Sequence, residues 1–188
     1  VFYIFFEATL IPMYFLIGGF GGEGRKKAAI KFLLFGLGGG LILLAGVVGV
    51  YATSAGAGHP TMLLGELAGL PMSAATERVL FVLFFISFAL KAPMVPFHTW
   101  LPDAAEAGTP GTSALLVGVL DKIGTFGMIR FCLELFPEAS QWASPVILVL
   151  ALISMIYGAL AAIGEKEILR LISFTSVSHF GFIVIGIF

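Results

Sequence analysis

Six apolar stretches, each about twenty residues long, follow one another along this chain. About twenty apolar residues at a helical rise of about 1.5 Å each are what the hydrocarbon core of a bilayer requires. Only 11% of the residues are charged, and the mean hydropathy is +1.07, whereas about 25% of a soluble domain is charged. The chain is therefore predicted to be an all-α integral membrane protein, a polytopic bundle of about six spans with one proline-broken helix. The expected spans are Val1–Phe20, Ala29–Ala52, Glu77–Trp100, Gly111–Leu133, Trp142–Ile163 and Ile168–Phe188.

The third stretch carries Lys91, followed at once by Pro93 and Pro96. An ammonium at the bilayer centre costs about 2.5–3.5 kcal/mol on insertion scales. Each proline lacks an N–H and clashes with the carbonyl four residues before it, so Ala89 and Ala92 lose their helical donors. A broken membrane helix beside a buried charge is typical of an ion or substrate path, because irregular backbone persists only where it lines protein or water. A lysine that snorkels to the interface near a helix end is the alternative.

Glu7 is the carboxylate of the first span, and no basic residue lies within helical reach of it. A carboxylate in hydrocarbon needs a partner on another helix, and Lys91 is the natural candidate. Such a pair forms a base that releases its proton when the partner moves, which is what a proton pump requires. The alternative is a static buried ion pair that only orients the helices.

Lys122 lies inside the fourth span, directly after Asp121. Adjacent residues point about 100° apart on a helix, so these two side chains need not pair. Gly124 and Gly127 leave room beside Lys122 for water or for a neighbouring helix. Together with Glu7, Lys91 and a histidine of the last span, Lys122 would complete a row of proton sites through the bundle interior.

His179 is that histidine, and Thr175 and Ser176 precede it on the same helical face. A histidine on a hydroxyl-lined stripe can pass protons through water near neutral pH. Alternatively, the hydroxyl groups only bond back to carbonyls of their own helix.

Several classes of function are disfavoured by what the chain lacks. The net charge of −1 argues against a nucleic-acid partner. Cys132 is the sole cysteine, so neither a disulfide nor a thiol-ligated metal or iron–sulfur site can form within this chain. The glycine-rich run Gly18–Gly24 has neither a preceding strand nor a following Lys-Ser/Thr. We therefore expect no cofactor and no metal on this chain, and the histidines lack metal-ligand spacing: His59, His98 and His179.

The distribution of basic residues predicts the orientation. Six of the ten lysines and arginines lie in or next to two connections, the first and the fifth. Because successive connections alternate between the two sides of the membrane, these six residues lie on one side. We therefore expect connections one, three and five, including His98–Pro110, on the cytoplasmic side. On the outer side, Pro60 is expected to open a short interfacial helix that runs to Gly69. The six basic residues are Arg25, Lys26, Lys27, Lys31, Lys166 and Arg170.

Four stretches, in this order, resemble the antiporter-like membrane subunits of respiratory complex I, the proton-pumping NADH:quinone oxidoreductase. Within that family the first and third of them resemble the M type of subunit more than the related L and N types. The stretches are Phe6–Tyr14 (FEATLIPMY), Leu90–Ala104 (LKAPMVPFHTWLPDA), Leu120–Gly127 (LDKIGTFG) and Ser176–Gly181 (SVSHFG).

The resemblance implies an inverted-repeat fold, and residues 1–188 would be a single antiporter-like domain from the middle of a longer subunit. It implies that Glu7, Lys91, Lys122 and His179 translocate protons, with Lys91 as the broken-helix lysine and Lys122 as the central connecting lysine. The activity would be that of a translocase coupled to quinone reduction elsewhere, with no redox chemistry on this chain. Its partners would be protons, lipid and the L- and N-type subunits, in a bacterial plasma membrane.

Three positions depart from the family pattern. Relatives often have histidine where Ala105 stands and lysine where Leu169 stands, with Arg170 beside the latter; Asp121 next to Lys122 is also unusual and could tune it. Two other functions stay open. A subunit of a multisubunit sodium/proton antiporter would share the fold and similar lysine motifs. A passive structural subunit would use its buried ion pairs only to set helix register.

Overall fold

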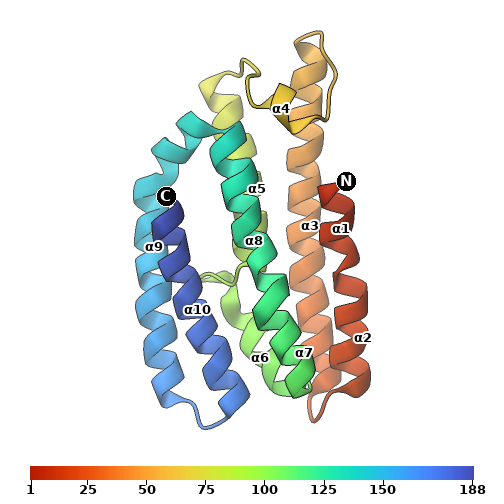
Figure 1. Ribbon diagram of the computed structural model, residues 1–188, viewed down its shortest axis with the longest axis vertical. Helices are drawn as coiled ribbons and strands as arrows, with labels where there is room; N and C mark the ends of the chain where they lie inside the picture. Colours follow the sequence, from red (N-terminus) through yellow and green to blue (C-terminus); the bar gives the residue numbers. More distant parts are fainter.

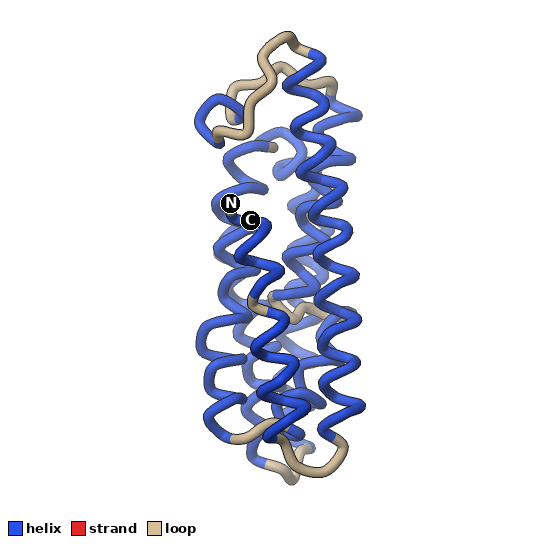
Figure 2. Tube along the Cα trace, turned by 90° about the vertical axis from the view of Figure 1, so that its right-hand side faces the viewer, coloured by secondary structure: helices blue, strands red, loops and turns tan.

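Each predicted apolar span is mostly helical in the computed structural model, which describes residues 1–188 and contains no strand (Figure 2). The expected all-α membrane bundle is confirmed, and the helices run roughly along one long axis (Figure 1). The elements are α1 (Phe2–Ala8), α2 (Leu10–Phe20), α3 (Arg25–Gly56), α4 (Leu64–Leu67), α5 (Ala74–Lys91), η1 (Phe97–Thr99), α6 (Trp100–Ala107), α7 (Pro110–Leu115), η2 (Leu116–Leu120), α8 (Asp121–Gly127), η3 (Met128–Leu133), α9 (Pro137–Gly164) and α10 (Ile168–Ile187).

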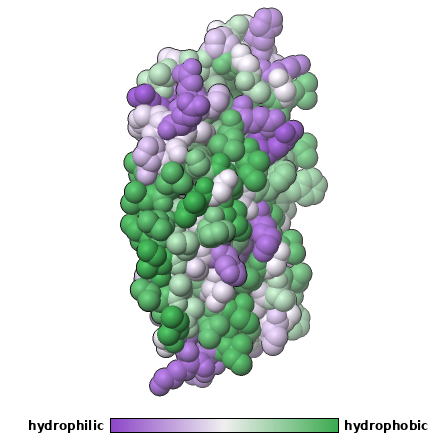
Figure 3. Space-filling view, turned by 60° about the vertical axis from the view of Figure 1, so that its left-hand side comes forward, coloured by the Kyte–Doolittle hydropathy of each residue, from purple (hydrophilic) through white to green (hydrophobic).

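Four helical stretches are long and apolar enough to cross a membrane: Phe2–Phe20, α3, α9 and α10. Hydrophobic side chains cover most of the middle of the face in Figure 3, polar ones gather at its top and bottom, and a few polar ones also lie at mid-height on the right. The remaining two spans also run along the bundle but are interrupted. The third is broken after α5, and the fourth contains two π-helical stretches, η2 and η3.

The broken third span is longer than the sequence indicates. It continues beyond Trp100 as α6, so much of the predicted His98–Pro110 connection is helical rather than a loop. The break between α5 and α6 lies near the middle of the long axis (Figures 1 and 2). The short outer helix is smaller than expected, with only Leu64–Leu67 helical. Gly65 and Gly69 weaken helix formation there.

Charged side chains tie three connections together at one end of the bundle. Lys31 of α3 pairs with Asp103 of α6 at 2.7 Å, and Arg170 of α10 pairs with Asp103 at 3.3 Å and with Glu106 at 2.9 Å. The amide of Gly22 also donates to the carbonyl of Ala107, at 2.8 Å. These contacts confirm that connections one, three and five share one end, while their cytoplasmic placement stays a prediction.

At the opposite end, the start of α9 is held by a buried carboxylate of α5. Oε1 of Glu77 accepts a hydrogen bond from the backbone N–H of Ala139, at 3.0 Å. The first N–H groups of a helix have no partner within the helix, so this carboxylate acts as a cap supplied by another helix. The contact explains why Glu77, although charged, is buried.

Replacing Glu77 with alanine is therefore expected to destabilise the fold by about 1–2 kcal/mol, because a buried N–H loses its acceptor. Thermal unfolding of the purified protein in detergent measures this as a lower Tm. Glu77→Gln keeps an acceptor oxygen and should lose less. Glu138→Gln, at an exposed carboxylate of the same helix end, is the control, and an equal loss in Glu138→Gln and Glu77→Ala would contradict the assignment.

Candidate functional site

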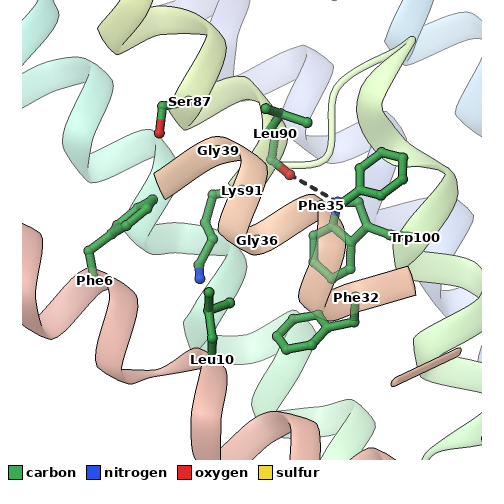
Figure 4. A pocket seen from close by; sticks show the side chains of 10 residues that line it. All are labelled: Phe6, Leu10, Phe32, Phe35, Gly36, Gly39, Ser87, Leu90, Lys91 and Trp100. Carbon is green, nitrogen blue, oxygen red and sulfur yellow. Dashed lines mark hydrogen bonds between the residues drawn. The ribbon is translucent and has the colours of Figure 1, made fainter. Parts of the chain in front are cut away.

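The break in the third span separates two half-helices that remain joined by one hydrogen bond. After Lys91 the chain is no longer α-helical until α6, and the indole N–H of Trp100 reaches back to the carbonyl of Leu90 at 2.9 Å (Figure 4). The sequence predicts that the carbonyl of Ala89 loses its helical donor. In the structure this carbonyl has another donor, the N–H of Met94, at 3.3 Å. The two prolines therefore redirect the backbone without unfolding it.

A serine of α9 fixes the broken segment to the second half of the bundle. The N–H of Val95 donates to Oγ of Ser154 at 3.3 Å, and that hydroxyl donates to the carbonyl of Val177 in α10, also at 3.3 Å. Ser154 is fully buried. The broken segment, α9 and α10 thus meet at one side chain.

Lys91 lies at the end of α5 with only 6% of its surface exposed. Its Nζ lies 3.3 Å from the hydroxyl oxygen of Thr9 and 4.8 Å from the centre of the Phe6 ring. Figure 4 shows the side chain pointing toward the first span, into a cavity of about 10 Å³ that Ser87 also lines. That volume is roughly the room for one water molecule. The negative end of the α5 dipole favours a cation at this position.

Glu7 lies near Lys91, but the two side chains do not form a direct ion pair. No contact between them accompanies the Thr9 bond, although they are within electrostatic reach. Oε1 of Glu7 is buried and has no hydrogen-bond partner. The carboxylate lies against Gly40 of α3, where a Cβ atom would overlap it. Lys91 thus bonds to Thr9, and no direct ion pair joins it to Glu7.

Asp121 is the residue whose position the sequence left undecided. It is fully buried, and neither of its oxygens has a hydrogen-bond partner. It directly precedes Lys122 in the chain. One turn further on, a Cβ at Gly124 would come within 2.6 Å of the backbone nitrogen of Ala92, so α8 packs directly against the end of α5. Gly124, two residues after Lys122, is the sequence feature from which this close approach could have been predicted.

The predicted place of Lys122 in an interior row of proton sites stays a prediction, since residues 1–188 leave this side chain uncovered. Its side chain is exposed on the surface of the described helices. The Nζ atom donates to the carbonyl of Val117 in η2 at 2.9 Å and lies 5.9 Å from the Phe180 ring of α10. Because adjacent helical residues diverge by about 100°, the burial of Asp121 turns Lys122 outward.

His179 is likewise exposed, and the predicted hydroxyl stripe beside it is only partly formed. Thr175 bonds to the carbonyl of Leu171 in its own helix at 2.9 Å, as the alternative interpretation expected. Ser178 instead donates to Met155 of α9 at 2.8 Å. Within residues 1–188, Lys91 and Asp121 are buried, Glu7 Oε1 is buried as well, and Lys122 and His179 are exposed.

The positions that depart from the family pattern have structural partners. Ala105 is buried, and its carbonyl accepts the hydroxyl of Ser113 at 2.7 Å. Arg170, beside Leu169, is held by the three acids Asp103, Glu106 and Glu165. No group of three or more potential ligand side chains is placed to hold a metal ion.

Comparison with known proteins identifies the family. The family model described as "NADH:quinone oxidoreductase/Mrp antiporter, TM" matches residues 1–188. NADH-quinone oxidoreductase subunit M from Mycobacterium tuberculosis is 54% identical over 195 residues, covering 100% of this chain and 35% of that protein. The chain thus spans about a third of the length of this relative.

Two solved structures share the fold. A chain of respiratory complex I from Thermus thermophilus with bound NADH is 38% identical, with a TM-score of 0.90 over 99% of this chain and 39% of that chain. A chain of the Mrp complex from Dietzia sp. is 27% identical, with a TM-score of 0.86 over 99% of this chain and 34% of that chain. Because the family description matches the whole chain, the chain belongs to the NADH:quinone oxidoreductase/Mrp antiporter family of transmembrane proteins.

Proposed function

We propose that this chain is part of a proton-translocating M-type membrane subunit of NADH:quinone oxidoreductase. The observation that carries the proposal is the buried Lys91 at the helix break, surrounded by polar atoms that have no partner. Glu7 Oε1, the Ser87 hydroxyl and both Asp121 oxygens are all buried and unpaired. Unpaired buried polar atoms are rare in folded proteins, and a catalytic role is one of the explanations for them.

In this mechanism, quinone reduction elsewhere in the complex changes the field or the access of water at Glu7 and Lys91. Lys91 then releases its proton toward Lys122, and His179 receives it next. A lysine suits this task because a buried ammonium has a high desolvation cost and moves readily between its charged and neutral forms. The chain supplies proton transfer, and the electron carriers belong to other subunits.

The proposed setting is the plasma membrane of a bacterium, beside other membrane subunits of the complex, including those of the L and N types. The subunit M relative from Mycobacterium tuberculosis supports this setting. The exposed apolar faces of α3, α9 and α10 provide the surface for lipid and for neighbouring helices.

The likeness to the Mrp complex supports a second candidate, a subunit of a multisubunit sodium/proton antiporter. Its lower identity, 27% against 38% for the complex I chain, makes it the weaker of the two. Membrane vesicles distinguish them. NADH drives proton uptake in the first case, whereas a sodium gradient drives it without NADH in the second.

Replacing Lys91 with alanine in the chromosomal gene is expected to abolish NADH-driven proton uptake, because the bundle loses its buried proton donor. Uptake is measured in inverted membrane vesicles with a dye that reports the pH gradient, and assembly is checked on a native gel. Lys166→Ala, at an exposed lysine, should behave as wild type. Normal uptake by an assembled Lys91→Ala complex would overturn the proposal.

Lys91→Arg separates a pump from a passive structural subunit. Arginine keeps the positive charge but does not release its proton in proteins. A translocating lysine therefore predicts that uptake is lost in this variant as well. Retained uptake would favour a lysine that serves only as a structural charge.

Removing the Lys122 side chain should slow the transfer that follows. We expect Lys122→Ala to lower uptake by about tenfold or more, in line with the loss of one proton-transfer group. Electron transfer from NADH to quinone is recorded in the same vesicles, so that uptake is expressed per quinol formed. An unchanged ratio would remove Lys122 from the path.

A further inference from the structure

Asp121 is given no proton-transfer step in the function proposed above, although no ionisable side chain in the structure is more deeply buried. Its exposure is 0%, against 6% for Lys91, and both of its oxygens lack a hydrogen-bond donor. A buried carboxylate that only stabilises a fold is normally paired and hydrogen-bonded, because an unsatisfied charge in the interior is costly. Glu77 shows the ordinary arrangement in this same chain, since its carboxylate accepts the Ala139 amide.

The two lysines of the proposed path have different surroundings. Lys91 points toward the first span and is buried, whereas Lys122 is exposed and bonds to Val117 in its own helix segment. No hydrogen bond joins the two lysines in the described helices, and each has a different partner. Asp121 is adjacent to Lys122 in the chain, and it lies on the buried side of α8, the helix that packs against the end of α5 where Lys91 stands.

The packing of α8 holds this carboxyl group at the helix break. Gly124 lets α8 approach the backbone of Phe88 and Ala92, at the end of α5. The π-helical stretch Leu116–Leu120 ends directly before Asp121. Such a π-bulge widens the helix by one residue and is frequent at functional sites.

We propose that Asp121 is a proton carrier that connects Lys91 to Lys122. The inference rests on the function proposed above and adds a residue to its path. The carboxyl group exchanges its proton with each lysine in turn, either by a change of side-chain rotamer or through one bridging water.

The transfer balances in protons and charge. The Lys91 ammonium gives one proton to the Asp121 carboxylate, which leaves a neutral amine and a neutral carboxylic acid. The acid then gives that proton to the neutral amine of Lys122, which restores the carboxylate and produces an ammonium there. Lys91 is reprotonated from the side of Glu7. One proton has moved, and no bond other than O–H and N–H has changed.

The test uses Asp121→Asn, which keeps the shape and the hydrogen-bonding capacity but cannot carry a proton. The variant is made in the chromosomal gene, and the intact complex is assayed in inverted vesicles. Proton uptake per quinol formed should fall by about tenfold or more. Asp121→Glu, which restores an acid, should regain most of it. Glu23→Gln, at an exposed carboxylate, is the control.

An infrared measurement separates a proton carrier from a fixed counter-ion. During NADH-driven turnover, a carrier gains and loses its proton, so a protonated-carboxyl band changes in wild type and is absent from Asp121→Asn. A permanently ionised counter-ion gives no such band. If Asp121→Asn does not assemble, Asp121→Glu decides, because the band must then move in frequency. A band at the wild-type frequency would overturn the proposal.

Lys91→Ala is measured in parallel, which keeps the two proposals distinguishable. Normal uptake in Lys91→Ala would overturn the pumping function itself. Lost uptake in Lys91→Ala together with a wild-type ratio in Asp121→Asn would overturn only the role of Asp121. Loss in both, with recovery in Asp121→Glu, is the expected result.

Discussion

The arrangement of this bundle depends on two missing backbone N–H groups, those of Pro93 and Pro96. In a membrane each unsatisfied backbone group costs several kcal/mol, so a break at this depth must be repaired by neighbours. The repair is visible: Trp100 bonds to Leu90, and the Val95 amide bonds to Ser154 of α9. The neighbouring helices are therefore drawn to the break, and Lys91 is buried among them as a result.

Close approach of backbones determines which groups reach Lys91. Gly40 lets the carboxylate of Glu7 lie flat against α3, and Gly124 lets α8 rest on the end of α5. In hydrocarbon, helices gain little from burying apolar surface against one another, so small residues and polar contacts decide how they pack. Two acids thus approach one lysine from different helices without forming a salt bridge that would fix its proton.

Sequence alone predicts the helices, the break at Lys91 and the ionisable residues within the spans, because charges and prolines stand out in apolar runs. It does not predict which side of a span faces inward, since a helix that is apolar all round has no periodic signal. For this reason the sequence does not indicate that Asp121, of the adjacent pair Asp121 and Lys122, is the one buried among the described helices. The π-helical stretches and α6 were missed because neither changes the composition of the chain. The cap by Glu77 depends on a contact 62 residues away along the chain.

The anchoring of the two half-helices has a mechanical consequence. Helix α6 is fastened to α3 and α10 through Asp103 and Glu106, while the far end of α5 is fastened to α9 through Glu77. The two half-helices are therefore attached to different helices of the bundle. When those helices shift relative to each other, the displacement is taken up by the short segment between the half-helices rather than by rigid helix. That segment begins directly after Lys91, so such a shift would change the surroundings of the buried lysine first.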